Sequence, residues 1–447
     1  MLDQSFSAEN FRAILDLENR KGVHLEDKLS MTSIRRINEK IKECNQGIRE
    51  KKKVNDFSSV NLLKEEKKKL REKKEVDLSE ELEKISNIVS SKTFSVEMVK
   101  CKGPDGKYIY KVPRKPDQYF ALKQVQRNIS KLFNVKQENR SKIVDQVKLL
   151  LGDQFPKFII RTDIKGFYES VPHESLLKII NDNNLLTPFS RKILRNILTS
   201  YKVLSGARGG VPRGIGVSAY LAELFMRDID NEIRNARGVC YYARYVDDII
   251  IIYTPESSPD DYNRNYLQEI KGVIEDKYKL KLNMSKTVSI DLRREKSSKV
   301  LEYLGYKFKF GDLPLVTLLS DNKVVRYKIK LKLAFDDYIN YGKVNEKDAR
   351  RLLVNRVRFL CTNTKLRNNK KNILVGIYYS NSQLSDISDL EKIDMSLASH
   401  IAGKIKSIHL QDRLKKYGFK KGFVDKVFSP FKPNELNEVK KVWGYMA

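Results

Sequence analysis

Apolar residues recur at helical spacing through the first hundred residues of the chain. The segment Ser7–Gly22 predicts a short helix, with Ser7 as its capping residue. Two longer stripes follow at steps of three and four, the spacing of amphipathic helices that pack along one face. Their members are Ile34, Ile37, Ile41, Cys44 and Ile48, then Leu78, Leu82, Ile85 and Val89. The pattern predicts a helical hairpin, with the lysine-rich run 64–74 between the stripes.

The lysine-rich run 64–74 has two interpretations. Its cations contact nucleic-acid phosphates, or they form a solvated helix face with i,i+4 ion pairs. The heptad-like stripes are equally compatible with an RNA clamp and with an oligomer interface.

Beyond residue 100 the pattern changes to short β-rich runs that alternate with helical ones. Strands are predicted within Lys157–Asp163, Tyr241–Tyr253 and Glu302–Phe310, from their content of Ile, Val, Tyr and Phe. After Ser320 the chain becomes helical and basic again, and Pro430 and Pro433 interrupt it before a last short helix. The expected fold class is α+β, with a helical extension at 1–99, a mixed core at 100–316 and a basic helical region at 317–447.

Charge narrows the range of partners. The chain has 447 residues, with 87 Lys and Arg against 57 Asp and Glu, a net charge of +30. Such an excess attracts a polyanion, nucleic acid first and an anionic membrane second. Because no apolar run approaches the roughly 20 residues that span a bilayer, and the N-terminus has no signal-peptide pattern, we expect an intracellular protein without a membrane anchor. The four cysteines stand singly, so neither a disulfide framework nor a zinc site is expected.

The strongest chemical signal is Tyr245-Val246-Asp247-Asp248, which lies between two apolar β runs. Adjacent carboxylates raise each other's proton affinity unless a cation neutralises them. Hard oxygen ligands without nearby Cys or His favour Mg²⁺, with Mn²⁺ as a substitute.

A second carboxylate, Asp163, ends the apolar run that begins at Phe158. It lies too far from Asp247 in sequence for local pairing, but neighbouring strands of one antiparallel sheet would bring the two together. Three aspartates can then share two metal ions roughly 3.5–4 Å apart, the arrangement that activates a 3′-hydroxyl and stabilises departing pyrophosphate. The pattern indicates phosphoryl transfer.

These segments, in this order, resemble the palm of reverse transcriptases. The YVDD turn resembles the family's [YF]xDD motif, and Asp163 in DIKGFY resembles its first metal-binding aspartate. Three more segments are similar to family motifs: the glycine-rich loop 210–218, the lysine-bearing segment 280–287 and the primer-gripping hairpin 301–308. The resemblance covers roughly 100–316 and implies a right-hand polymerase with fingers, an antiparallel palm and a helical thumb.

The resemblance also implies roles for individual residues. Asp163 and Asp247 would be the principal metal ligands, with Asp248 as third carboxylate and the Ile164 carbonyl completing a site. Tyr168 would be the steric gate that favours deoxynucleotides, or else a packing aromatic. Lys286 would protonate the leaving pyrophosphate, or else be a solvated lysine. The loop residues that would hold template and incoming base are Gly210, Pro212, Arg213 and Gly214.

Two departures from the family pattern stand out. Arg213 occupies the position usually held by Gln, and its guanidinium can bind a phosphate or a base edge. In the hairpin 103–113 the expected triphosphate-binding arginine is missing from its place, and Lys111, Arg114 or Lys107 are the candidates to replace it. We also predict a basic helix over 123–140 that meets the template backbone.

Three segments, one of them the glycine-rich loop itself, resemble bacterial defence-associated reverse transcriptases of the abortive-infection-like class, above all the type with paired reverse transcriptases and a non-coding RNA. The segments are 6–22, 210–226 and 366–381. The resemblance implies a cytoplasmic bacterial enzyme that copies a non-coding RNA into DNA from dNTPs in anti-phage defence, with a second reverse transcriptase or another copy of itself as a further partner. Alternatives are a template-independent or protein-primed DNA polymerase, an RNA-binding maturase-like scaffold and an RNA-dependent RNA polymerase. Template, primer, oligomeric state and phage trigger are not encoded in any pattern recognised in the sequence.

Overall fold

The computed structural model describes residues 2–20, 24–29, 31–103, 106–136, 138–153, 155–182, 184–256, 263–293, 298–310, 314–366 and 373–444. The chain forms two compact units. Unit 1 contains residues 1–136 and 166–229, and unit 2 contains residues 137–165 and 230–447. The three-domain division made from the sequence stays a prediction.

Unit 1 is mainly helical. Its elements are α1 (Ala8–Arg20), α2 (Leu25–Lys28), α3 (Thr32–Lys53), α4 (Phe57–Ser90), β1 (Val99–Lys102), β2 (Tyr108–Lys111), α5 (Pro116–Leu132), α7 (Phe167–Ser170), α8 (His173–Asp182), α9 (Pro188–Ser205) and most of α10 (Gly216–Arg234). Phe11 of α1 stacks on Phe120 of α5, with ring centroids 5.2 Å apart, and both rings are fully buried. This aromatic pair ties the N-terminal helix to the helix that follows the β1–β2 hairpin.

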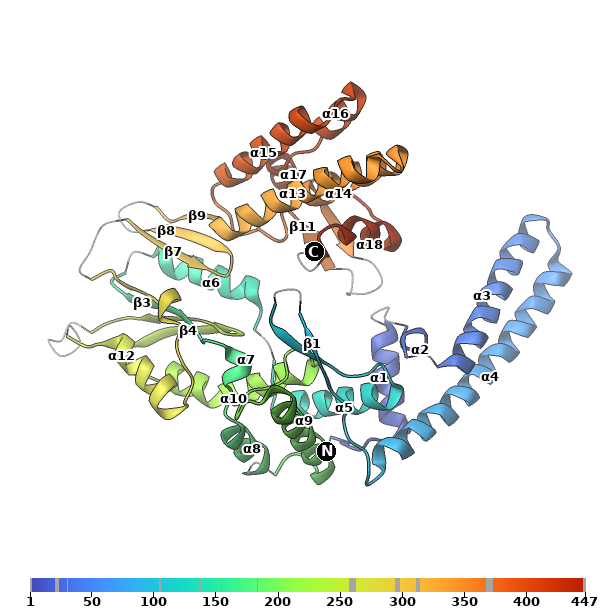
Figure 1. Ribbon diagram of the computed structural model, residues 1–447, viewed down its shortest axis with the longest axis horizontal. Coiled ribbons are helices and arrows are strands. Elements are labelled where there is room, and N and C mark those ends of the chain that lie inside the picture. Colours follow the sequence, from blue (N-terminus) through green and yellow to red (C-terminus); the bar gives the residue numbers. More distant parts are fainter. Residues whose placement is uncertain are drawn as a thin grey trace. The chain divides into compact units, whose positions relative to one another are not determined.

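The predicted helical hairpin is confirmed as α3 and α4, which lie side by side in Figure 1. Asp56 caps α4 by accepting a hydrogen bond from the Ser59 N–H, so the turn between the helices ends at a defined residue. The first predicted helix is confirmed as α1, with the Ser7 hydroxyl accepting a hydrogen bond from the Asn10 N–H. Gly22, where the prediction ended, lies outside the described residues.

Unit 2 is built on an antiparallel sheet of four strands in the order β4-β5-β3-β6. The strands are β3 (Phe158–Asp163), β4 (Val239–Tyr245), β5 (Asp248–Tyr253) and β6 (Val288–Asp291). Ile249, Ile250, Ile251 and Ile252 of β5 are all fully buried. A strand buried on both faces reads as a continuous apolar run, and this explains why the sequence shows no alternation here.

A second antiparallel sheet and a helical region complete unit 2 (Figure 1). The sheet has the order β7-β8-β9, and Ile143 and Val147 of α6 share a buried cluster with Phe308 of β8. The remaining elements are α6 (Arg140–Gly152), α12 (Tyr266–Lys271), η1 (Gly272–Lys277), η2 (Met284–Lys286), β7 (Lys299–Tyr303), β8 (Tyr306–Phe310), β9 (Val316–Leu319), α13 (Asp321–Gly342), α14 (Glu346–Cys361), β10 (Asn363–Leu366), β11 (Ile373–Gly376), α15 (Ser388–Lys404), α16 (Ile408–Lys415), α17 (Phe419–Val424) and α18 (Pro433–Lys441). The helices after residue 320 share a separate apolar cluster around Phe335 and Leu353.

One predicted helix is wrong in its bounds. The sequence suggested a continuous basic helix over 123–140, but α5 ends at Leu132 and α6 starts at Arg140. Asn134 takes a left-handed conformation with φ of 49°, and the Asn139 side chain caps α6 by accepting from two backbone N–H groups. Arg140 therefore belongs to unit 2 and not to the helix that carries Lys123.

Among the described helices, none combines the length and the apolar character that crossing a bilayer requires.

Candidate active site

Strand register brings the predicted carboxylates together. Asp163, the last residue of β3, pairs directly with Asp248, the first residue of β5. Asp247 lies one position earlier, in the turn that joins β4 to β5, and its carbonyl oxygen accepts a hydrogen bond of 3.2 Å from the Ile164 N–H. Three aspartates that are distant in sequence are therefore gathered at one edge of the unit 2 sheet.

The turn that carries Asp247 is strained. Tyr245 pairs with Asp248, which leaves Val246 and Asp247 as the two loop residues of a hairpin. Val246 has a φ of 62°, a left-handed conformation that costs a β-branched residue about 1–3 kcal/mol. The surrounding structure has to supply this free energy.

Arg244 supplies a fixed contact to the strained turn. Its Nη1 donates to the carbonyl oxygen of Val246 at 2.8 Å, while Nε and Nη2 donate to the two carboxylate oxygens of Asp230, each at 2.8 Å. Arg244 is only 6% exposed. The bidentate pair holds the guanidinium rigidly, and the guanidinium in turn holds the Val246 carbonyl.

Two of the three carboxylates are paired with cations. Arg161 Nη2 lies 2.5 Å from Asp248 Oδ1, and Lys286 Nζ lies 2.6 Å from Asp163 Oδ2. Arg161 Nη1 also donates to the carbonyl oxygen of Lys286 at 2.9 Å. Arg161 therefore connects the Asp248 carboxylate to the backbone of η2, the segment that presents Lys286.

The electrostatics of this edge favour a further cation. Burial, and then the neighbouring charges of Asp248 and Asp163, raise the pKa of the Asp247 carboxyl. The second oxygen of Asp163, Oδ1, is buried and has no hydrogen-bond partner. Within the described residues, no group of three or more His, Cys, Asp or Glu side chains has the geometry of a metal site as it stands. The three carboxylates, including the unpartnered Asp163 Oδ1, fit a hard divalent cation. Lys286 and Arg161 contact carboxylate oxygens that such an ion would also contact.

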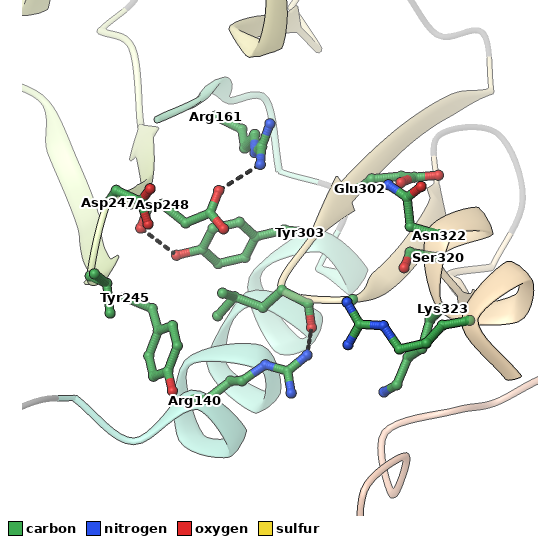
Figure 2. Close-up of a pocket in the computed structure, with 14 residues that line it drawn as sticks. Arg140, Arg161, Tyr245, Asp247, Asp248, Glu302, Tyr303, Ser320, Asn322 and Lys323 are labelled. Atoms are coloured by element: carbon green, nitrogen blue, oxygen red, sulfur yellow. Dashed lines mark hydrogen bonds and ion pairs between the residues drawn. The ribbon is translucent and has the colours of Figure 1, made fainter. Parts of the chain in front are cut away.

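A cavity of about 490 Å³ opens beside Asp247 and Asp248, entirely within unit 2 (Figure 2). Its lining includes the cations Arg140, Arg161, Lys323 and Arg326. Arg140 donates to the Leu304 carbonyl oxygen at 2.5 Å, and a Cβ added to Gly305 would lie 2.7 Å from Arg140 Nη2. Gly305, at a φ of 77°, leaves open the space that the Arg140 guanidinium occupies.

Lys323 is an unusual member of this lining. Burial, followed by the nearby charges of Arg140 and Arg326, lowers the pKa of Lys323 to about 7. Its ammonium donates to the Ser380 carbonyl oxygen at 3.1 Å and lies 4.9 Å from the centre of the Tyr306 ring. A cavity with this many cations beside carboxylates suits an anionic group that approaches the aspartate edge.

The other predicted site residues lie in unit 1, where they form a group of their own. Tyr168 is in α7, and its carbonyl oxygen accepts from the Val211 N–H at 2.6 Å. The loop packs tightly here, because a Cβ on Gly210 would lie 2.8 Å from the Glu169 carbonyl oxygen. The predicted gate tyrosine and the start of the glycine-rich loop, Gly210 to Pro212, are thus fixed to each other.

The β1–β2 hairpin packs on the same loop. The Tyr110 N–H donates to the Arg213 carbonyl oxygen at 2.7 Å, and a Cβ on Gly214 would lie 2.7 Å from the Tyr110 carbonyl oxygen. Lys111 ends β2, Arg114 lies between β2 and α5, and both side chains are exposed. Pro104 and Asp105 at the hairpin tip lie outside the described residues, and the choice of triphosphate-binding cation stays a prediction.

Sequence reasoning missed Arg161, Arg244 and Lys323 at the aspartate edge and its cavity, and it assigned Arg140 to a helix on the template backbone instead of to this cavity. Arg161 and Arg244 had a weak signal, since each is a charged residue inside an otherwise apolar strand. For Arg140 and Lys323 the sequence holds no local signal, because only tertiary packing brings them to the cavity.

Comparison with known proteins agrees with this geometry. Residues 118–308 match the model of the family described as reverse transcriptase (RNA-dependent DNA polymerase). This segment of the chain is therefore similar to a reverse transcriptase domain. The predicted fold class, α+β with antiparallel sheets and many helices, is confirmed.

The individual proteins that this chain matches share little sequence identity with it. The chain is 24% identical to Protein YkfC of Escherichia coli (strain K12), in a match that covers 41% of this chain and 58% of that protein. It is also similar to solved telomerase structures. For apo telomerase from Candida tropicalis truncated from the C-terminal domain, the TM-score is 0.35 at 15% identity, with 58% of this chain and 70% of that one covered. For telomerase from Candida albicans in complex with a fragment of telomeric RNA, the TM-score is 0.38 at 11% identity, and the match covers 80% of this chain and 65% of that one.

Replacing Arg244 with methionine should strongly destabilise unit 2. The change leaves the Asp230 carboxylate without its cation and releases the strained turn, so we expect the free energy of unfolding to fall by about 3–5 kcal/mol in urea denaturation. Arg237→Met is the matched control, because its ion pair with Glu256 is exposed and should contribute less than about 1 kcal/mol. Equal losses in the two variants would contradict the role given to Arg244.

The lowered pKa of Lys323 predicts that anion binding in the cavity depends on pH. Because its pKa is lowered to about 7, this lysine is largely neutral above that pH, and a bound phosphate group has to restore its proton. Affinity for a short DNA duplex, measured by anisotropy at constant salt, should therefore fall as the pH rises from about 6.5 to 8.5. Lys323→Arg should flatten this dependence, since arginine remains charged. An unchanged slope in the variant would show that Lys323 does not contribute.

Proposed function

We propose that this protein is a reverse transcriptase that extends a 3′-hydroxyl with deoxynucleotides on an RNA template. The observation that carries the proposal is the convergence of Asp163, Asp247 and Asp248 at one sheet edge, inside the segment that matches the reverse transcriptase family. The basic cavity beside them and the net charge of +30 add support.

Asp163, Asp247 and Asp248 would hold two divalent cations, Mg²⁺ with Mn²⁺ as a substitute, and the Ile164 carbonyl would complete one site. When bound, the two ions would activate the attacking hydroxyl and stabilise the pyrophosphate that leaves. The unpartnered Asp163 Oδ1 and the raised pKa of Asp247 support this assignment.

Lys286 would act as the general acid. Its hydrogen bond to Asp163 raises the pKa of the ammonium, so the lysine carries a proton to donate at neutral pH. Arg161 would act as a positioning residue, because its contacts to Asp248 and to the Lys286 carbonyl oxygen keep the acid near the carboxylates.

The cavity lined by Arg140, Lys323 and Arg326 would hold the 3′-terminal nucleotide of the primer. Its cations match a phosphodiester backbone, and its wall contains Asp247 and Asp248, where the primer hydroxyl has to arrive. In unit 1, the loop at Gly210, Pro212, Arg213 and Gly214 would hold template and incoming base, with Lys111, Arg114 or Lys107 on the triphosphate.

The finer biological assignment rests on the sequence resemblance alone. We infer a dedicated non-coding RNA as template, a role in bacterial anti-phage defence, a cytoplasmic location and a second reverse transcriptase or a further copy of this chain as partner. The similarity of 6–22, 210–226 and 366–381 to defence-associated enzymes supports these inferences. Residues 21–22 and 367–372 of these segments lie outside the described residues.

The test is incorporation of labelled dNTPs by the full chain on a primed RNA template with Mg²⁺. Asp163→Asn should lower incorporation at least about a hundredfold, because it removes a carboxylate that stabilises charge in the transition state. Asp412→Asn, a change of the same kind at an exposed site of α16, should leave the rate unchanged. Failure of the unmodified chain to incorporate any dNTP would favour the RNA-binding scaffold.

Tyr168→Ala should relax sugar selectivity. If the Tyr168 ring excludes a ribose 2′-hydroxyl, its removal should raise the ratio of rNTP to dNTP incorporation by roughly tenfold or more, which corresponds to about 1.4 kcal/mol. Tyr341→Ala, at an exposed position of α13, should leave the ratio unchanged. A ratio that stays the same in the Tyr168 variant would identify this residue as a packing aromatic.

A further inference from the structure

The hairpin of α3 and α4 uses its apolar stripe internally. Ile34, Ile37 and Cys44 of α3 are buried, as is Val60 of α4. The two helices approach closely, since a Cβ on Gly47 would lie 3.0 Å from Cδ1 of Leu63. These buried positions are not available to a second copy of the chain, so the outward-facing side chains determine what the hairpin binds.

Charge along the hairpin is uneven. The distal segment, defined as residues 49–71, contains nine Lys and Arg against four Asp and Glu. The remainder of the hairpin, residues 32–48 and 72–90, contains seven against eight. The positive charge is thus concentrated where α3 ends and α4 begins.

The cations of the two parts also differ in their partners. Outside the distal segment, Arg35 pairs with Glu39 and Lys74 with Glu26. Within the distal segment, the ion pair found among the described residues is that of Lys51 with Asp56, at 3.2 Å. Lysines that are exposed there without an ion pair to a described residue are Lys52, Lys53, Lys64, Lys68 and Lys69. Their mutual repulsion is therefore only weakly compensated within the chain.

The arrangement of these cations suits an extended polyanion. Lys64, Lys68 and Arg71 follow one face of α4 at steps of four and three, which places successive charges roughly 5–6 Å apart along the helix axis. Phe57, at the start of α4, is 66% exposed and lies seven residues before Lys64, about two turns along the same face of the helix. An exposed aromatic ring next to a row of cations is the combination by which proteins bind single strands, with bases stacked and phosphates neutralised.

We propose that the distal segment is a nucleic-acid binding surface separate from the polymerase site, with the phosphodiester backbone on its lysines and a base stacked on Phe57. A second copy of the chain is a poorer occupant, because two distal segments would bring like charges together. The proposal goes beyond the polymerase activity and does not depend on it.

Binding is measured with the full chain carrying Asp247→Asn, so that catalysis plays no part. The probes are fluorescein-labelled single-stranded RNA and DNA of one sequence, about 30 nucleotides long, titrated at several salt concentrations. The test variant is Lys53→Gln, Lys64→Gln, Lys68→Gln and Arg71→Gln together. Its matched control is Lys40→Gln, Lys42→Gln, Lys73→Gln and Lys84→Gln, which removes the same charge from exposed positions of the same two helices.

The distal variant should weaken binding at least about tenfold at low salt and reduce the slope of log affinity against log salt by about 2–3, near 0.7 for each lost phosphate contact. The control variant should change the slope by less than about 1. RNA bound more tightly than DNA would identify RNA as the ligand, and equal binding would identify any single strand. Equal slopes for the two variants, with unchanged helix content by circular dichroism, would overturn the proposal.

Substitution of Phe57 gives an independent test of the proposal. Phe57→Ala should weaken single-strand binding roughly fivefold or more without changing the salt slope, because stacking involves no counterion. Leu62→Ala, equally exposed at 66%, should have no effect. If the distal variant instead loses binding only to phosphatidylserine vesicles, or only changes the mass of the protein in light scattering, the surface serves a membrane or an oligomer and the proposal is wrong.

Discussion

The repulsion among Asp163, Asp247 and Asp248 is the constraint on which the candidate active site depends. Antiparallel pairing sets Asp163 opposite Asp248, and the two-residue turn adds Asp247 beside them. Such a cluster is stable only with compensating positive charge. Arg161 and Lys286 supply part of it from within the chain, and the unpartnered Asp163 Oδ1 leaves room for more.

The rest of unit 2 maintains this unfavourable cluster. Four consecutive buried isoleucines keep β5 in the core on both of its faces, so the strand that starts at Asp248 lies in the interior of the sheet between β4 and β3. Arg244, held by Asp230, keeps the Val246 carbonyl in place and so offsets the strain of the turn. Tyr168 lies only five positions after Asp163, yet the two belong to different compact units, and the chain passes between them through Gly166 at a φ of 58°.

Much of this architecture can be predicted from the sequence, because the residue patterns that specify it are local. The β3 and β5 strands follow from short apolar runs, the YVDD turn from adjacent carboxylates between two such runs, and the α3–α4 hairpin from apolar stripes at helical spacing. Arg161 and Arg244 could not be assigned from the sequence, since their partners depend on strand order and on the position of α10. The helix break before Arg140 was missed because Asn134 in a left-handed conformation, and not a proline, ends the helical run. The stripes of the hairpin left two uses open, and burial of Ile34 and Cys44 shows that these positions are covered by the chain itself.

The most direct test of the account is whether the three aspartates bind a divalent cation together. Titration of the full chain with Mn²⁺, followed by electron paramagnetic resonance, should reveal bound Mn²⁺ whose affinity falls at least about tenfold in Asp247→Asn and is unchanged in Asp412→Asn. Equal affinity in all three proteins would mean that the carboxylates gathered by β3 and β5 do not form a metal site, and the proposed catalytic role of this edge would be wrong.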